Sequence, residues 1–110
     1  MQRHLLTDFE LMILLAVLRA GDEGYGMRIA EEIQRITGRS VLMGAIYAAL
    51  DRLERNELVS STIGDPTPQR GGRAKRFFEV TPRGLRAVKQ TREALIALWT
   101  DVPQLKERRT

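Results

Sequence analysis

One segment of the chain carries most of the information about its architecture: residues 40–55 read SVLMGAIYAALDRLER. Its apolar side chains recur at the i, i+3, i+4 and i+7 spacing of one helix face, and they are Ile46, Ala49, Leu50 and Leu53. The opposite face begins with small residues and ends with basic ones. Because a helix with small side chains near its start can enter a groove about 12 Å wide, the segment predicts a helix suited to the major groove of DNA.

Two helices are expected before this segment. Thr7 and Glu10 have the spacing of a capping box, which predicts the start of a helix that ends near Gly21 and is apolar nearly all round. A second, amphipathic helix follows residues 24–26 and ends at Gly38. Its polar side is expected to face away from the core and carries Arg28, Glu31, Glu32 and Arg35.

Two strands and a last helix are expected after the segment. Residues 58–63 and 76–80 are short and rich in β-branched or aromatic side chains, so we expect them to pair as a hairpin. Residues 64–73 between them are rich in Gly and Pro and too long for a tight turn, which predicts a protruding, mobile loop. Thr81-Pro82 suits the N-cap and first position of a helix that is expected to run to about Thr100.

This order of elements predicts a fold class that is mainly α with a small β-hairpin. It is the layout of a winged helix-turn-helix domain with a long C-terminal helix, in which the third helix is the usual groove reader. We expect residues 1–81 to form the DNA-binding domain and residues 82–110 to form a dimerisation helix with a frayed tail, joined in one compact unit.

The basic charge of the chain is concentrated in its second half. The 110 residues carry 18 Lys and Arg against 14 Asp and Glu, a net charge of +4. Residues 69–92 contain eight of the basic side chains and only one acidic side chain, Glu79. Such a segment favours binding to a polyanion such as nucleic acid. From charge alone, a basic surface that only maintains solubility is the alternative.

Several motifs resemble those of a known family. They are GAIYAALDRLE at residues 44–54, LV at 58–59, RGGRAKRFF at 70–78 and TPRG at 81–84. In combination they are similar to the PadR family of winged-helix transcriptional regulators, in its short branch with a single C-terminal helix. The resemblance implies a repressor-like regulator that binds double-stranded, pseudo-palindromic operator DNA as a homodimer. Leu42 and Glu57 stand where the family often has serine and glycine, so Ser40 and Asn56 are expected to cap the third helix.

The residues expected to contact DNA lie on the third helix and in the hairpin. They are Met43, Gly44, Ala45, Tyr47, Ala48, Arg52, Arg70, Arg73 and Lys75. Tyr47 lies off the apolar face, so its hydroxyl is expected to bond to a phosphate; a half-buried packing tyrosine is the alternative. Base contacts are assigned to residues 43–45, which carry few polar groups. We therefore expect methyl contacts, backbone approach and DNA shape to share in the readout.

The strongest candidates for electrostatic affinity surround the second strand: Arg70, Arg73, Lys75 and Arg76. Alternate residues of a strand point to opposite faces, so not all four can reach DNA, and Arg73 beside two glycines has the freest reach. For Lys75 and Arg76 a surface ion pair is the alternative. For Arg52 and Arg55 of the third helix the sequence leaves two roles open. They either contact the DNA backbone or form ion pairs with the neighbouring Asp51 and Glu54.

Dimerisation is expected through the first and last helices. The candidate contacts are Leu11, Leu14, Leu15, Leu18, Val88, Leu95, Leu98, Trp99 and Val102. They come from the apolar first helix and from a heptad-like seam on the last one. Trp99 is the only tryptophan of the chain. We expect it to anchor the dimer, and a pocket that stacks an apolar or aromatic effector molecule is the alternative.

The sequence disfavours catalysis and cofactor binding. It has no cysteine, and its one histidine, His4, has no carboxylate or nucleophile at motif spacing. Gly71-Gly72 is not followed by Lys and Ser or Thr, so the phosphate-binding P-loop is missing. We therefore expect no enzyme, no metal and no cofactor.

The longest apolar run, residues 11–18, is too short to cross a bilayer. Without a secretion signal either, a cytoplasmic location and no membrane partner are expected. A winged-helix module that binds protein or RNA is the alternative function, because a fold alone does not determine a function.

Overall fold

The computed structural model describes residues 5–64 and 75–106, which form four α-helices and one hairpin. The helices are α1 (Asp8–Ala20), α2 (Gly26–Thr37), α3 (Met43–Arg55) and α4 (Pro82–Trp99). Strands β1 (Val59–Ile63) and β2 (Arg76–Val80) pair antiparallel, and the short 3-10 helices are η1 (Gly21–Glu23) and η3 (Pro103–Leu105). The predicted fold class is confirmed. The predicted hairpin loop lies almost wholly outside the described residues.

The ends of α1, α2 and α4 follow their sequence signals. The Glu10 N–H donates to Thr7 Oγ1 at 3.2 Å while the Thr7 N–H donates to Glu10 Oε1 at 2.9 Å, so the capping box is confirmed. Gly38 ends α2 in the left-handed conformation, with φ of 76°. Thr81 accepts the Gly84 N–H at 3.0 Å and caps α4, as predicted.

The ends of α3 differ from the prediction. The helix begins at Met43, and Leu42 is its N-cap residue with no side-chain hydrogen bond, so the expected cap by Ser40 is wrong. At the other end Asn56 has a negative φ, and Glu57 takes the left-handed conformation with φ of 63°. A tertiary contact accompanies this conformation, because the Thr81 hydroxyl donates to the Glu57 carbonyl oxygen at 2.7 Å.

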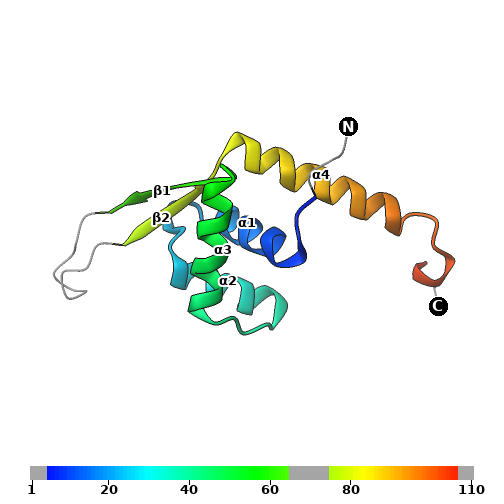
Figure 1. Cartoon of the computed structure of the whole chain (residues 1–110). Helices are drawn as coiled ribbons and strands as arrows, with labels where there is room; N and C mark the ends of the chain where they lie inside the picture. The colour runs from blue at the N-terminus through cyan, green and yellow to red at the C-terminus, as the bar shows by residue number, and fades with distance from the viewer. Residues whose placement is uncertain (1–4, 65–74, 107–110) are drawn as a thin grey trace.

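The core lies where α1, α2 and α3 meet the base of the hairpin. All four residues of the predicted apolar face of α3 are fully buried, which confirms that face. Phe78 from β2, Ile29 from α2 and Ile13 from α1 complete the centre of the core. Figure 1 shows that the hairpin projects from one side of this core and the C-terminal half of α4 from the opposite side.

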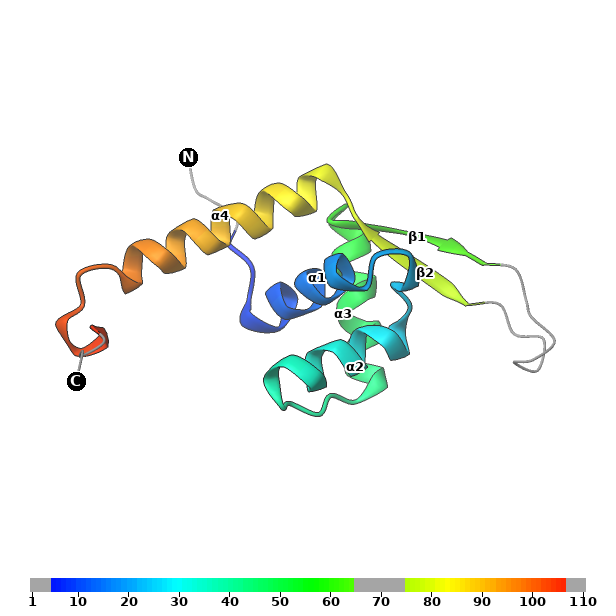
Figure 2. The ribbon, with the colours of Figure 1, turned by 180° about the vertical axis from the view of Figure 1, so that it is seen from behind.

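The two halves of α4 have different surroundings. Its first half joins the core through Ala87 and Val88, and the Leu6 N–H donates to the buried Thr91 hydroxyl at 3.0 Å. From Leu95 onward the helix is exposed, and it extends past the N-terminal end of α1 in both views of the ribbon (Figures 1 and 2). Within residues 5–64 and 75–106 no helix is both long and apolar enough to span a membrane.

Candidate nucleic-acid interface

The outer face of α3 combines small residues at its start with arginines at its end. Among the predicted DNA contacts, the exposed ones on this helix are Gly44, Ala45, Tyr47, Ala48 and Arg52, and Met43 is partly buried. Because the opposite face is sealed in the core, this outer face is the side of α3 that a duplex can reach. A Cβ on Gly44 would meet nothing within 4 Å, so the face is open at its start.

Arg76 of β2 binds both acidic residues of α3. Its guanidinium donates to Asp51 Oδ1 at 3.1 Å and also to Glu54 and to the Ser61 hydroxyl. Glu54 in turn accepts the Ser61 hydroxyl at 2.7 Å. This network joins α3 to the hairpin, so Arg76 serves mainly as a structural residue, and the ion-pair alternative describes it better than DNA contact.

The same network decides the question about the arginines of α3. Since Asp51 and Glu54 pair with Arg76, neither forms an ion pair with Arg52 or Arg55. Over the described part of the chain, Arg52 and Arg55 form no salt bridge, and both are exposed. Their positive charges therefore remain available to an anion at the C-terminal end of the helix.

Tyr47 lies across the junction of α2 and α3. A Cβ built on Gly26, the first residue of α2, would fall 2.5 Å from both Cζ and Oη of Tyr47. The ring therefore rests on the bare backbone of Gly26, while 40% of the residue is exposed. Tyr47 therefore packs on α2 through the hydroxyl end of its ring and is partly exposed on the outer face of α3; its expected contact with a phosphate stays a prediction.

A second contact fixes the base of the hairpin against the start of α2. The Phe78 N–H donates to the Gly24 carbonyl oxygen at 2.8 Å, and the Tyr25 and Phe77 rings meet edge to face at 5.7 Å. Lys75 Nζ lies 3.5 Å from the centre of the Tyr25 ring, a cation–π contact that places its charge beside the hairpin. The predicted contacts Arg70 and Arg73 lie outside the described residues.

Comparison with known proteins identifies the family. The model of the transcriptional regulator PadR-like family matches residues 14–90, which is more than half of the chain. The chain belongs to this family. PadR-like proteins are DNA-binding regulators of transcription and are generally not enzymes. No curated protein matches the sequence.

Solved structures share the fold of this PadR-like chain. A transcriptional regulator from Clostridium thermocellum superposes with a TM-score of 0.69 at 23% identity, over 89% of this chain and 92% of that one. A PadR-like regulator from Bacillus cereus has a TM-score of 0.70 at 20% identity, over 92% and 93% of the two chains. A PadR family regulator from Clostridium difficile has a TM-score of 0.68 at 23% identity, over 87% and 96%.

The candidate dimer contacts of this PadR-like regulator fall into three groups by their burial. Leu15 and Leu18 on α1 and Leu95, Leu98 and Trp99 on α4 are exposed, whereas Leu11 and Val102 are partly buried. Leu14 is fully buried and Val88 nearly so, both within the core of the single chain. Their side chains are therefore removed from any surface that a second copy can touch, and we leave them out of the proposed interface.

The sequence interpretation placed Arg28, Glu32 and Arg35 on the side of α2 that faces away from the core, and for the buried Glu32 this is wrong. The carboxylate of Glu32 is almost fully buried and binds three arginines, Arg19 at 2.8 Å, Arg28 at 3.1 Å and Arg35 at 2.6 Å. Hydrogen bonds from Arg35 and Arg19 lower the pKa of Glu32 from 4.5 to about 2. Arg28 and Arg35 have the helical spacing of ion-pair partners, but Arg19 comes from α1, which the pattern of α2 does not reveal.

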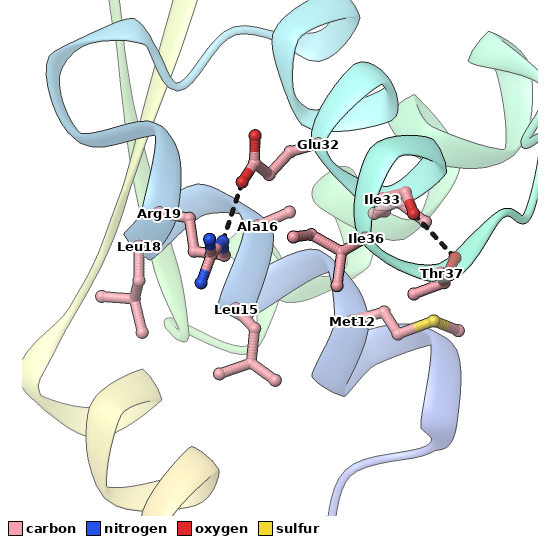
Figure 3. A pocket seen from close by; sticks show the side chains of 9 residues that line it. All are labelled: Met12, Leu15, Ala16, Leu18, Arg19, Glu32, Ile33, Ile36 and Thr37. Carbon is pink, nitrogen blue, oxygen red and sulfur yellow. Dashed lines mark hydrogen bonds and ion pairs between the residues drawn. The ribbon is translucent and has the colours of Figure 1, made fainter.

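This cluster borders an apolar groove between α1 and α2 (Figure 3). The groove has a volume of about 380 Å³, and Figure 3 shows side chains of both helices around it. Its walls are Met12, Leu15, Ala16, Leu18, Arg19, Glu32, Ile33, Ile36 and Thr37. The ion pair between Arg19 and the buried Glu32 carboxylate thus ties α1 to α2 at one edge of the groove.

Proposed function

We propose that this PadR-like regulator is a homodimeric repressor that binds a pseudo-palindromic operator in double-stranded DNA. The observation that carries the proposal concerns the outer face of α3. Arg76 forms ion pairs with both acidic side chains of this helix, and the guanidinium groups of Arg52 and Arg55 are exposed. A face with small residues at one end and free cations at the other matches a helix that inserts into the major groove and is held by flanking phosphates.

The residues of this face divide into two roles. Tyr47, Arg52 and Lys75 are assigned to phosphates, because a phenol, a guanidinium and an ammonium all donate to phosphate oxygens. Met43, Gly44 and Ala45 are assigned to the base edges, because they occupy the start of the helix, and Ala48 follows on the exposed side of α3. The basic residues Arg70 and Arg73 of the hairpin loop are assigned to the DNA backbone beside the groove.

Dimerisation is proposed through the exposed apolar residues of α1 and α4. Leu98 and Trp99 are 76% and 65% exposed, respectively, on a helix end that projects beyond the core. Apolar side chains that gather in this way on a soluble chain mark a protein contact. In a two-fold dimer the projecting end of α4 from each copy would cover α1 of the other, and the two copies of α3 would address successive half-sites.

Trp99 is proposed as an anchor of this dimer. It also borders a shallow cavity of about 320 Å³ formed with Leu95, Ile96 and Thr100, which leaves an apolar or aromatic effector as its second candidate partner. Fluorescence of this one tryptophan separates the two roles. A change of the fluorescence with protein concentration, without ligand, reports dimerisation. A saturable change of the fluorescence when an aromatic compound is added to the dimer reports effector binding.

The test of the proposed function is a binding experiment with duplex DNA. Genomic fragments retained by the protein are sequenced, and we expect an inverted repeat. If six to ten phosphates are contacted per dimer, affinity for that repeat falls by about 10³ to 10⁵ between 50 and 200 mM salt. A flat salt response, or equal competition by single-stranded RNA, would contradict the proposal.

Two further measurements test the assembly and the direction of regulation. Sedimentation is expected to give a dimer for the native chain, and Leu98→Glu, which places a charge in the proposed interface, is expected to shift it toward a monomer. Transcription in vitro from a promoter that contains the selected repeat should decrease when the protein is added. An increase would identify an activator.

A further inference from the structure

The base-reading half of α3 has almost no side chain able to hydrogen-bond to a base edge. Within residues 41–50 Tyr47 is the one polar side chain, and its ring rests on Gly26. Major-groove hydrogen bonds come mainly from Arg, Lys, Asn, Gln, Asp, Glu, Ser and Thr, and none of these types occurs in this stretch. Direct readout by the start of α3 must therefore use apolar contact.

Leu42 is the prominent apolar group at this end of the helix. It is 82% exposed, the highest value among the large apolar side chains of residues 5–64 and 75–106. Its backbone is nevertheless fixed, because its carbonyl oxygen accepts the N–H groups of Ala45 at 3.0 Å and Ile46 at 3.1 Å. The side chain thus projects from the N-terminal end of α3 and is not part of the core of its own chain.

The neighbours of Leu42 allow a close approach to DNA. Gly44 and Ala48 are exposed and have small side chains, so no bulky group beside the leucine keeps the backbone of α3 away from a partner. The exposed charge of Arg52 lies nearly three turns further along the helix, where a phosphate would hold the helix in place. This juxtaposition of an apolar tip, a small face and a cationic end fits the inside of a major groove better than a purely apolar partner.

We infer that Leu42, supported by Ala45 and Ala48, recognises thymine in the operator through its C5-methyl group. This inference rests on the proposed binding of duplex DNA. Among the groups that base pairs present in the major groove, the thymine methyl is the apolar one. A leucine that would otherwise stay in water gains by covering it, whereas it offers nothing to the hydrogen-bonding edges of guanine or cytosine.

The experiment compares duplexes with and without these methyl groups. A duplex selected from a random-sequence library is prepared again with deoxyuridine in place of thymidine, which removes the methyl and keeps base pairing. We expect the affinity of the native chain to fall about fourfold for each contacted methyl group. With one contact in each half-site the total loss is about 16-fold.

Leu42→Ala assigns the effect to this residue. The variant is expected to bind the thymidine duplex about as weakly as the native chain binds the deoxyuridine duplex, and to make no difference between the two duplexes. Leu105→Ala is the matched control, an exposed leucine in η3 at the far end of the chain from α3 (Figure 1), and should keep the full difference. Thermal unfolding checks that both variants fold.

Two outcomes would overturn the inference and leave the proposed function intact. Equal affinity of the native chain for both duplexes would show that the methyl is not read, as when Leu42 wedges between base pairs or packs on a second protein copy. A difference that persists in Leu42→Ala would assign the methyl to another residue. Failure of the proposed function looks different, because neither duplex would then bind in a salt-sensitive manner.

Discussion

Gly84 in the first turn of α4 lies directly against the backbone of Leu58, the residue before β1. A Cβ built on Gly84 would collide with the Leu58 carbonyl oxygen and lie 2.9 Å from Val80 Cγ1. The same carbonyl accepts the Thr81 N–H at 3.1 Å. The Thr-x-x-Gly motif at residues 81–84 therefore has a packing reason: it lets α4 start in contact with the end of the helix-turn-helix unit.

The first prediction compares two helical glycines. Gly84→Ala is expected to lower the free energy of unfolding by about 3 kcal/mol, because the new methyl meets backbone that cannot move aside. Gly44→Ala, where a Cβ meets nothing within 4 Å, is expected to raise it by about 0.5–1 kcal/mol through helix propensity. Urea unfolding measures both, and a Gly84→Ala chain as stable as the native one would contradict the packing argument.

The second prediction separates the two roles of Tyr47. Tyr47→Phe keeps the ring on Gly26 but loses the hydroxyl, so affinity for all duplexes is expected to fall about tenfold with stability little changed. Gly26→Ala acts on the packing instead and is expected to cost about 1–3 kcal/mol of stability, since the ring must move. Binding titrations and urea unfolding read the two effects. Native affinity in Tyr47→Phe would leave the residue with packing alone.

The third prediction contrasts Arg76 with Arg52. Arg76→Ala removes the guanidinium that binds Asp51 and Glu54, and because the site is partly exposed we expect a loss of about 1 kcal/mol of stability. Arg52→Ala is expected to leave stability within about 0.5 kcal/mol. It should instead weaken binding to all duplexes and reduce the slope of log affinity against log salt by about 1 for each lost phosphate contact. An Arg76→Ala chain of native stability and lower affinity would make Arg76 a DNA contact.

The fourth prediction concerns acid stability. The folded-state pKa of Glu32, about 2, lies below the value of 4.5 for an unperturbed carboxyl, so the folded chain holds this group ionised where the unfolded chain protonates it. The stability from Glu32 is complete above pH 4.5 and is lost as the pH falls toward 2.

Glu32→Gln tests this linkage. At pH 7 it should unfold at a lower temperature than the native chain, because three arginines lose their shared carboxylate. Below pH 4.5 its stability should fall less steeply than that of the native chain. Glu31→Gln, on the exposed side of the same helix, is the matched control and should follow the native chain. Parallel pH curves for the native and Glu32→Gln chains would refute the assignment.

Much of the fold was predictable because its signals are local. The capping box of Thr7 and Glu10 and the cap by Thr81 each act over three residues, so the order of residues already contains both partners. The apolar face of α3 was predictable for a related reason, since helical spacing alone brings Ile46 and Leu53 to one side.

The site was predictable only in part, because its electrostatics depend on distant partners. Asp51 lies 25 residues from Arg76, and Glu32 lies 13 from Arg19, distances along the chain at which no periodicity pairs side chains. Leu14 and Leu15 were both predicted as dimer contacts because the first helix is apolar nearly all round, and only the tertiary packing shows that Leu14 is buried and Leu15 exposed.

The linear order of residues was thus enough for the helices, the hairpin and the family of regulators, because caps, spacing and motifs act over a few positions. Only the tertiary structure showed which charged side chains form ion pairs with Glu32 and Arg76 and which stay exposed on α3. Ion pairing depends on the distance between charges in space. The tertiary structure also leaves Leu42 exposed at the N-terminal end of α3. Because no part of the chain that the structure describes covers this side chain, a binding partner can bury it.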